Sequence, residues 1–251
     1  MAALALLIPL STAFPIIHPR GPIAALPPSA TAEELRWQPS MDFDQDGCYN
    51  VAAVDASGSI VPGLPHNWVD LASECRDAAD LSAAENNVYV RRRCNAGWCV
   101  YLYDYYFEKD VAVPNFIDPG HTHDWEHIAV WVRDGAGAEF VAVSQHGEYE
   151  IRAAAELRWD GEHPKVVYHK DGVSTHAFRF AFEDDDAIEN HTGAWYRGPL
   201  VNYDGFPGGV RDVLFAHDFG QANIAIKDSS FPGNIANSRP DGVEFDENAD
   251  S

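Results

Sequence analysis

Residues 120–132 read Gly120-His121-Thr122-His123-Asp124-Trp125-Glu126-His127-Ile128-Ala129-Val130-Trp131-Val132. The part from 127 to 132 is β-branched and aromatic, which favours a strand over a helix. Asp118-Pro119, just before it, predicts a turn that leads into the strand. Because successive side chains of a strand point to opposite faces, Asp124 and Glu126 should share a face. We therefore expect two carboxylates side by side, about 7 Å apart by strand rise.

Strand patterns of the same kind recur on both sides of this stretch, with Gly and Pro between them. They cover 88–91, 98–107, 139–144, 165–169 and 177–181, with short candidates at 213–215 and 225–227. Helical patterning is strongest at 77–87. There is no internal repeat. The sequence thus predicts a mainly β, single-domain antiparallel β-sandwich with peripheral helices and loops.

The composition is strongly acidic, with 39 Asp and Glu against 17 Lys and Arg and a formal net charge of −22. Nucleic acid is excluded as a partner, because phosphate binding needs a basic cluster that this sequence does not offer. Attraction to anionic lipid by charge alone is disfavoured for the same reason. A bound divalent cation would suit this charge, although the excess also serves solubility by itself.

The two ends of the chain differ from its middle. An apolar run and the small residues Ser11-Thr12-Ala13 are typical of a secretory signal peptide over 1–13, too short to span a membrane. A Pro- and Ala-rich leader follows over 14–35, and the domain itself is expected over 36–240. The acidic tail over 241–251 is expected to be frayed. No other stretch reaches transmembrane length.

Four cysteines fit two disulfides in an oxidising compartment. Three pairings are possible, and we favour Cys48–Cys75 with Cys94–Cys99. A zinc site on all four cysteines is the rival, but the paired CxxC spacing is missing. Asn190-His191-Thr192 is a glycosylation sequon, which predicts a surface loop in a secreted protein.

The seven residues 120–126 hold two imidazoles and two carboxylates. Such groups repel one another and lose solvation on burial unless something positive binds them. An oxygen-rich set, with His121 reaching in from the turn, suits a hard cation such as Mg²⁺ or Ca²⁺. The alternative is that these groups pair with basic residues, of which only Lys109 and Arg133 are near in sequence.

A zinc hydrolase is a second alternative, because 123–127 matches the inverted zinc-protease motif H-x-x-E-H through His123, Glu126 and His127. That chemistry requires a helix, so that two histidines one turn apart hold zinc while the Glu activates water. Here the motif follows a turn and leads into a β-branched run. The strand context therefore argues against the hydrolase.

Several blocks of the sequence, in order, resemble the necrosis- and ethylene-inducing peptide-like proteins. An aromatic strand ending in Lys109-Asp110 precedes the heptapeptide 120–126, which in that family reads Gly-His-Arg-His-Asp-Trp-Glu. The further blocks are 143–147, 175–181, 204–207 and 218–223. The likeness runs from about 42 to 237.

The resemblance implies a secreted β-sandwich toxin of plant-associated microbes rather than an enzyme. Such proteins bind glycosyl inositol phosphorylceramide, a sphingolipid of plant plasma membranes, and permeabilise the membrane, causing necrosis. The family's divalent-ion pocket maps onto Asp110, His121, Asp124 and Glu126. His123, Thr122 and Trp125 lie in the same motif and are expected to support the pocket. We expect a monomer.

Two departures from the family pattern bear on toxicity. Thr122 replaces the usual Arg, which removes a cation from the pocket rim, and the connection from Asp110 to His121 is longer than in typical members. Some members keep the fold without toxicity. A non-cytolytic secreted binder of glycans or sphingolipids, or an immune elicitor, is therefore the main alternative to a toxin.

Overall fold

The centre of the fold is a pair of long antiparallel strands, β3 (Trp98–Val111) and β4 (Gly120–Arg133). The computed structural model describes residues 23–66, 71–112 and 120–250. The strands predicted at 98–107 and 127–132 are the first part of β3 and the later part of β4. The predicted signal peptide (1–13), the start of the predicted leader and the turn at Asp118-Pro119 lie outside the described residues.

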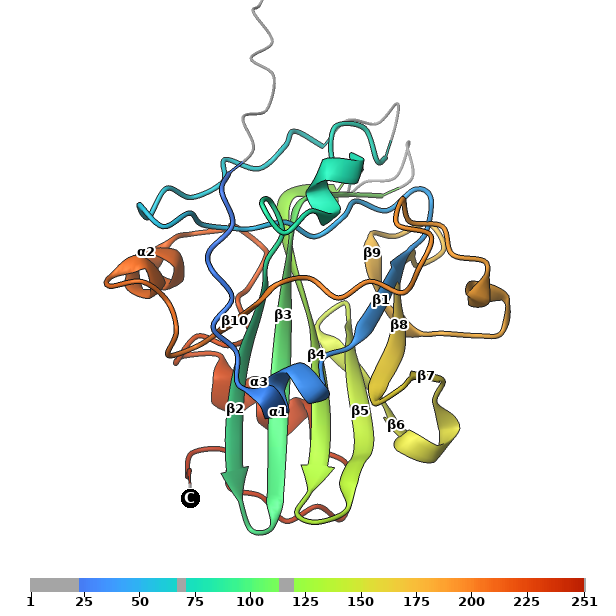
Figure 1. Ribbon diagram of the computed structural model, residues 1–251, viewed down its shortest axis with the longest axis vertical. Coiled ribbons are helices and arrows are strands. Elements are labelled where there is room, and N and C mark those ends of the chain that lie inside the picture. Colours follow the sequence, from blue (N-terminus) through green and yellow to red (C-terminus); the bar gives the residue numbers. More distant parts are fainter. Residues whose placement is uncertain (1–22, 67–70, 113–119, 251) are drawn as a thin grey trace, which may run out of the picture.

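Two sheets are built around this pair (Figure 1). The large sheet has the order β10-β2-β3-β4-β5-β6, with β2 (Val88–Asn95), β5 (Gly137–Gln145), β6 (Glu148–Ala153) and β10 (Leu200–Asn202). The small sheet contains β1 (Ser40–Phe43), β7 (Trp159–Asp160), β8 (His163–Lys170) and β9 (His176–Phe180). The pairings β1–β8 and β10–β2 are parallel, so the sheets are mixed rather than purely antiparallel.

The two sheets pack on each other across an aromatic core. Tyr103, Tyr105 and Phe107 point from β3 into this core, and Tyr168 and Phe178 meet them from the small sheet. Phe107 and Tyr168 stack with ring centroids 3.9 Å apart. Every second residue of β3 contributes, as strand geometry requires. The predicted mainly β sandwich is confirmed.

The opposite face of the large sheet carries a second core. Trp125 and Trp131 of β4 point into it, together with Ile235 of the C-terminal part of the chain. That part supplies α2 (Val210–Ala216) and α3 (Phe231–Ser238) as a cover over the sheet. The large sheet is therefore buried on both faces, and side chains on either side of β4 are held in place.

The helix predicted at 77–87 is wrong, because only the short 3₁₀ helix η1 (Ala78–Leu81) forms there. Asn86 explains the early stop: its Nδ2 donates to the carbonyl oxygens of Asn50 and Asp80. Side-chain bonds of this kind compete with helical ones. The other short 3₁₀ helices are η2 (Ala154–Glu156) and η3 (Asp184–Asp186).

The late strands predicted at 213–215 and 225–227 are also wrong. Residues 213–215 belong to α2, whose buried Val210 and Leu214 are four apart on one helix face. The amides of residues 225 and 226 donate to Asp104 Oδ2 instead of to a neighbouring strand. Among the residues that the structure describes, no helix is long and apolar enough to cross a bilayer.

The described part of the predicted leader packs on the domain. Leu26 is 1% exposed and lies in the second core. Thr31 caps the short helix α1 (Ala32–Arg36), and Glu34 completes a capping box. The folded structure therefore includes residues before 36.

The acidic tail is packed rather than frayed over its described part. Val243 and Phe245 are both in the second core. Asn95 Nδ2 donates to the carbonyl oxygen of Asp246 at 2.8 Å, and the amide of Asp246 donates back to Asn95 Oδ1 at 2.9 Å. The acidic composition of the tail gave no indication that these two apolar side chains would pack on the large sheet.

Both predicted disulfides, Cys48–Cys75 and Cys94–Cys99, are confirmed. Asn190 contradicts its sequon, because its side chain is buried and its Nδ2 donates to Asp42 Oδ1 and to the carbonyl oxygen of Ala194. A glycan on that nitrogen would replace one of its two hydrogens, so at least one of these bonds would be lost. The structure thus argues against glycosylation at this position.

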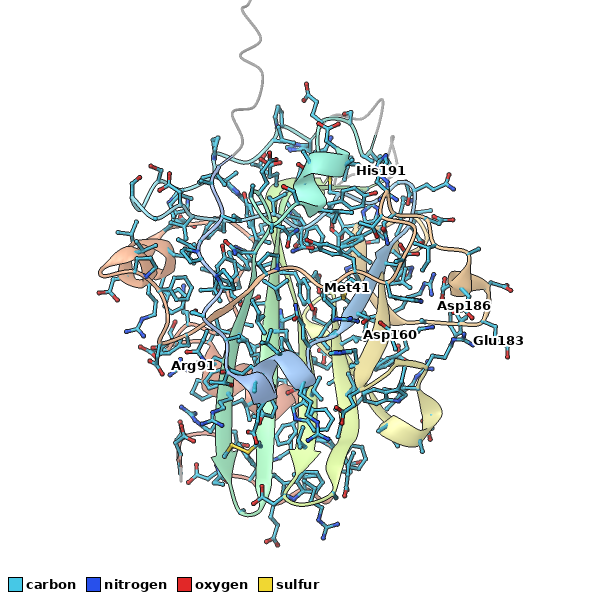
Figure 2. The ribbon with its side chains drawn as sticks, viewed as in Figure 1. Met41, Arg91, Asp160, Glu183, Asp186 and His191 are labelled. Atoms are coloured by element: carbon cyan, nitrogen blue, oxygen red, sulfur yellow. A yellow bond between two sulfur atoms is a disulfide. The ribbon has the colours of Figure 1, made fainter. Side chains whose placement is uncertain are left out.

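Ion pairs gather on the exposed flank beside the small sheet. Asp160 and Asp186, both labelled in Figure 2, lie on this flank and accept from basic side chains. Asp160 pairs with Arg197, and Asp186 with Arg158 and Lys165. These three basic side chains are therefore paired with acids of this flank, and not with the acidic heptapeptide 120–126.

Candidate metal centre

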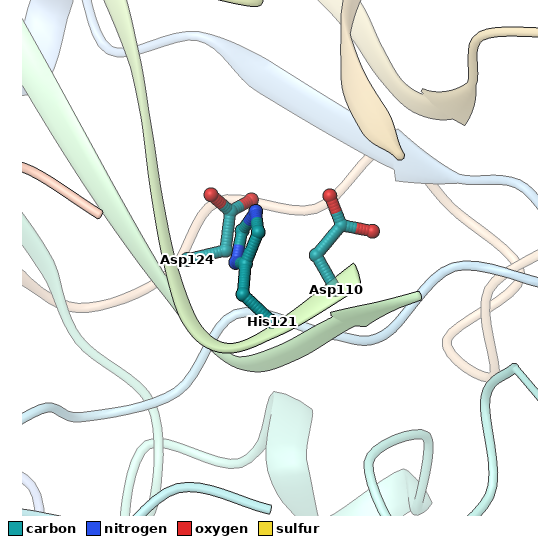
Figure 3. A group of neighbouring side chains, drawn as sticks. All are labelled: Asp110, His121 and Asp124. Atoms are coloured by element: carbon teal, nitrogen blue, oxygen red, sulfur yellow. The ribbon is translucent and has the colours of Figure 1, made fainter. Parts of the chain in front are cut away.

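Three predicted ligands come together at the end of the central strand pair. Asp110 is near the end of β3, while His121 and Asp124 lie near the start of β4 (Figure 3). One ligand atom from each lies within 4.8 Å of the others. Asp110 is 2% and Asp124 5% exposed, so water contributes little to their solvation.

The backbone at His123 explains how these residues meet. Positions 121 and 124 are three apart and would point to opposite faces of a regular strand. His123 has a φ of 64°, which is the left-handed backbone conformation that residues other than Gly rarely adopt. This one residue interrupts the alternation, so that His121 joins Asp124 on the same side.

The same feature orients the His121 ring. His121 Nδ1 lies 2.7 Å from the carbonyl oxygen of His123. A carbonyl only accepts hydrogen bonds, so Nδ1 must donate, and in the neutral ring Nε2 then carries the lone pair. A metal-binding histidine is held in this way by a hydrogen bond on its second nitrogen.

Asp110 is held by His176, the first residue of β9. The His176 amide donates to both Asp110 carboxylate oxygens, at 3.0 and 2.9 Å, and its ring Nδ1 lies 2.7 Å from Oδ1. Burial alone would lower the pKa of His176, but hydrogen bonds to Asp110 and Asp46 outweigh it and raise the pKa to about 9. The ring is therefore positively charged at neutral pH, with both nitrogens protonated, and its Nδ1 donates to Asp110.

Asp124 is held by Tyr168 of β8, whose hydroxyl donates to Asp124 Oδ2 at 3.2 Å. The Tyr168 ring stacks on both Phe107 and His176. Burial raises the pKa of Asp124 to about 7, the nearby Asp110 adds to the rise, and His121 opposes it. A cation in the group would stabilise the ionised form that burial disfavours.

Glu126 does not join the three-residue group, although it was predicted as a fourth ligand. It is buried on the Asp124 side of β4, where its Oε2 accepts from the Ser144 hydroxyl. Burial, followed by the charge of Asp124, holds its pKa well above the usual range. Its carboxyl group therefore has a hydrogen-bond partner of its own from β5.

The three predicted supporting residues have different surroundings. The Thr122 hydroxyl donates to the carbonyl oxygen of Leu64 at 3.0 Å, and His123 Nδ1 lies 2.6 Å from the Tyr106 hydroxyl. Trp125 points away from the group into the second core. Thr122 and His123 thus shape the backbone beside the ligands, and Trp125 anchors the strand behind them.

The zinc-hydrolase geometry is not formed. His123, Glu126 and His127 all lie on β4, so the two histidines are about 13 Å apart along the strand. Burial lowers the pKa of His127 to about 4, and its ring packs against Tyr149. These side chains cannot converge on one zinc ion as the helical motif requires.

Of the two groups that hold the ligands, sequence reasoning missed Tyr168 and left His176 open between a pocket role and a core role. Tyr168 left no signal, because an aromatic residue in a strand reads as core. His176 is part of the 175–181 block of the resemblance, but core bonding explained it equally well. The donor set itself, two carboxylates and one imidazole, fits a hard divalent cation with water completing its shell.

Comparison with known proteins gives related sequences and folds. A profile described as necrosis inducing protein (NPP1) matches residues 31–238. The chain is 31% identical over 197 residues to NLP effector protein 10 of Phytophthora capsici, covering 76% of each. The solved structure of NLPPya in complex with mannosamine has a TM-score of 0.71 at 26% identity, covering 86% of this chain and 96% of that one. For the non-toxic HaNLP3 protein the TM-score is 0.69 at 25% identity, covering 88% and 98%.

Proposed function

The chain belongs to the necrosis inducing protein (NPP1) family, and we propose that it is a secreted toxin of plant membranes. In this proposal it binds the sugar headgroup of glycosyl inositol phosphorylceramide through a divalent cation and then permeabilises the plasma membrane of the host. It acts as a monomer and catalyses no reaction.

The convergence of Asp110, His121 and Asp124 carries this proposal. Two buried carboxylates close together are costly, and although His176 donates to Asp110, the pKa of Asp124 stays raised, so a cation that contacts both carboxylates would stabilise them. Mg²⁺ and Ca²⁺ take six or more ligands, so these three protein groups would leave further coordination positions to be filled. Sugar hydroxyls can fill such positions in place of water.

The known complexes of a similar protein support a sugar as the ligand. NLPPya has been solved with glucosamine and with mannosamine. A cation bridging protein carboxylates and sugar hydroxyls reconciles an uncharged or anionic headgroup with a net charge of −22. For this chain, the headgroup sugar would therefore bind only when the cation is present.

Dye leakage from vesicles tests the proposal. Wild-type protein should empty phosphatidylcholine–sterol vesicles that contain the plant sphingolipid, and should leave vesicles without it intact. EDTA or Asp124→Asn should slow leakage at least tenfold, whereas Asp134→Asn, an exposed acid in the β4–β5 turn, should not. Leakage that is indifferent to EDTA and to Asp124→Asn would contradict the cation mechanism.

A non-cytolytic binder or immune elicitor is the second candidate. It is favoured by Thr122, which contacts the neighbouring segment and places no cation at the rim. The similar fold of the non-toxic HaNLP3 shows that this architecture does not by itself make a toxin. Cation-dependent binding to sphingolipid vesicles without dye release would identify this second function.

A further inference from the structure

The segment 61–66, called the strap here, crosses the two ligand-bearing strands beside the candidate metal centre. The Leu64 amide donates to the carbonyl oxygen of Glu108 on β3 at 2.9 Å. The Leu64 carbonyl oxygen accepts from the Thr122 hydroxyl on β4 at 3.0 Å. One residue of the strap thus ties β3 two positions before Asp110 to β4 one position after His121.

The strap is itself held at both sides of the large sheet. Val61 is buried in the second core, and its amide donates to the carbonyl oxygen of Ala53 at 3.0 Å. Leu64 is buried in the core between the sheets. Pro62 and Pro65 restrict the backbone between and after these anchors. The strap therefore has few conformations available and can act as a fixed support.

Gly63 allows the strap to lie directly on the heptapeptide. It has a φ of 70°, and a Cβ added to it would be 2.6 Å from the Thr122 methyl carbon and 2.7 Å from His123 Cε1. No other residue type fits that space without displacing its neighbours. The small side chain at position 122 and the glycine at 63 are thus complementary.

From this geometry we infer that Thr122 is a positioning residue for the metal centre and acts through the strap. The inference rests on the proposed cation site. Its hydroxyl fixes the start of β4, where His121 must meet Asp110 across the strand pair. Position 122, where the resembled family has Arg, here holds a hydrogen bond in place of a charge.

A large side chain at position 122 conflicts with this arrangement. Gly63 fills the space above the Thr122 methyl group. An Arg side chain at position 122 must therefore either displace the strap or extend in a direction other than that of the Thr122 methyl group. We expect Thr122→Arg to weaken cation binding by about tenfold, in the range seen when groups that support metal ligands are lost.

Calorimetric titration of the full chain with Ca²⁺ alone and with Mg²⁺ alone tests the inference. Thr122→Val keeps the shape and removes the hydroxyl, and should raise the Kd for the cation about tenfold or more. Thr122→Ser keeps the hydroxyl and should stay within about twofold of wild type. A purely structural role would lower the stability of the metal-free protein in urea and leave the Kd unchanged.

The outcomes separate the inference from the proposed function. If wild type binds neither ion, the cation site itself is wrong. If wild type binds and Thr122→Val binds equally well, the site stands and the positioning role is overturned. Should Thr122→Val fail to fold, Gly63→Ala decides, since it retains the hydroxyl but pushes the strap from the heptapeptide. An unchanged Kd in Gly63→Ala would then overturn the inference.

Discussion

The two halves of the β3–β4 pair serve different purposes. In the half that contains 127–133, alternation is regular: Ile128 and Val130 enter the core between the sheets, while Ala129 and Trp131 enter the second core. In the half that contains 120–126, alternation breaks at His123 and polar ligands gather. Regular alternation along β4 fills both cores with apolar side chains, and its interruption at His123 creates a place for charge.

Trp131→Ala should give the largest effect, on stability alone. The side chain is fully buried, and truncation of such an aromatic costs about 3–5 kcal/mol. We expect the urea midpoint to fall accordingly, with the cation Kd of the folded fraction within about twofold of wild type. A large loss of cation affinity in this variant would show that the two halves are coupled rather than separable.

The pH dependence of the metal-free protein should report the irregular half. Asp124 and His176 both have raised pKa values, about 7 and about 9, so each favours the folded state at low pH. The contribution of Asp124 is lost as pH rises from about 4 to 7, and that of His176 from about 6.5 to 9.

Urea unfolding in EDTA should therefore show stability falling between pH 5 and 9, by at most about 1.4 kcal/mol per pH unit for one proton. Cation affinity should instead rise with pH up to about 7, because binding requires ionised Asp124. In Asp124→Asn the fall between pH 5 and 7 should be reduced. A slope unchanged by that substitution would assign the dependence to other groups.

Tyr168→Phe should weaken cation binding by about tenfold, since it removes the hydroxyl that orients Asp124. Tyr105→Phe is the matched control, because Tyr105 is as deeply buried in the same core and its hydroxyl has no partner among the described residues. Removal of an unpartnered buried hydroxyl should be neutral or slightly stabilising. Equal cation Kd values for the two variants would dismiss the orienting role of Tyr168.

His123→Gly compared with His123→Ala should give the smallest effect. Both variants lose the imidazole and its bond to Tyr106, and they differ in their tolerance of a φ of 64°. Gly should be the more stable by about 1 kcal/mol in urea, although Gly is otherwise the poorer residue in a strand. If Ala proves equal or better, the left-handed backbone is not maintained in solution.

The sequence predicted the regular half of the β3–β4 pair better than the irregular half. Strand periodicity placed Asp124 and Glu126 on one side of β4, and the resemblance supplied Asp110. The sequence did not indicate that His123 would be left-handed, because that conformation is expected mainly for Gly. The bond of His123 to the Tyr106 hydroxyl, which accompanies it, comes from the neighbouring strand β3. Partners from distant segments, such as His176 on Asp110, likewise have no local signal.

Errors outside the site had a related cause. The helix expected at 77–87 followed intrinsic propensity, which the buried side chain of Asn86 overrode with its own hydrogen bonds. The tail was judged by its acidic composition, although Val243 and Phe245 pack in the second core and Asn95 bonds to Asp246. In both places a few long-range contacts decided the structure against the average character of the segment.

The parallel pairing of β1 with β8 constrains the order in which the protein can assemble. Ser40 pairs with Lys165, so a chain that emerges from its N-terminal end carries β1 unpaired until most of its length has appeared. Both disulfides, by contrast, join cysteines that are all present once Cys99 has emerged. Closure of the small sheet, and with it the arrival of Tyr168 and His176 beside the ligands, is therefore a late event. Because such non-local pairings form slowly, the metal centre should mature after the covalent framework.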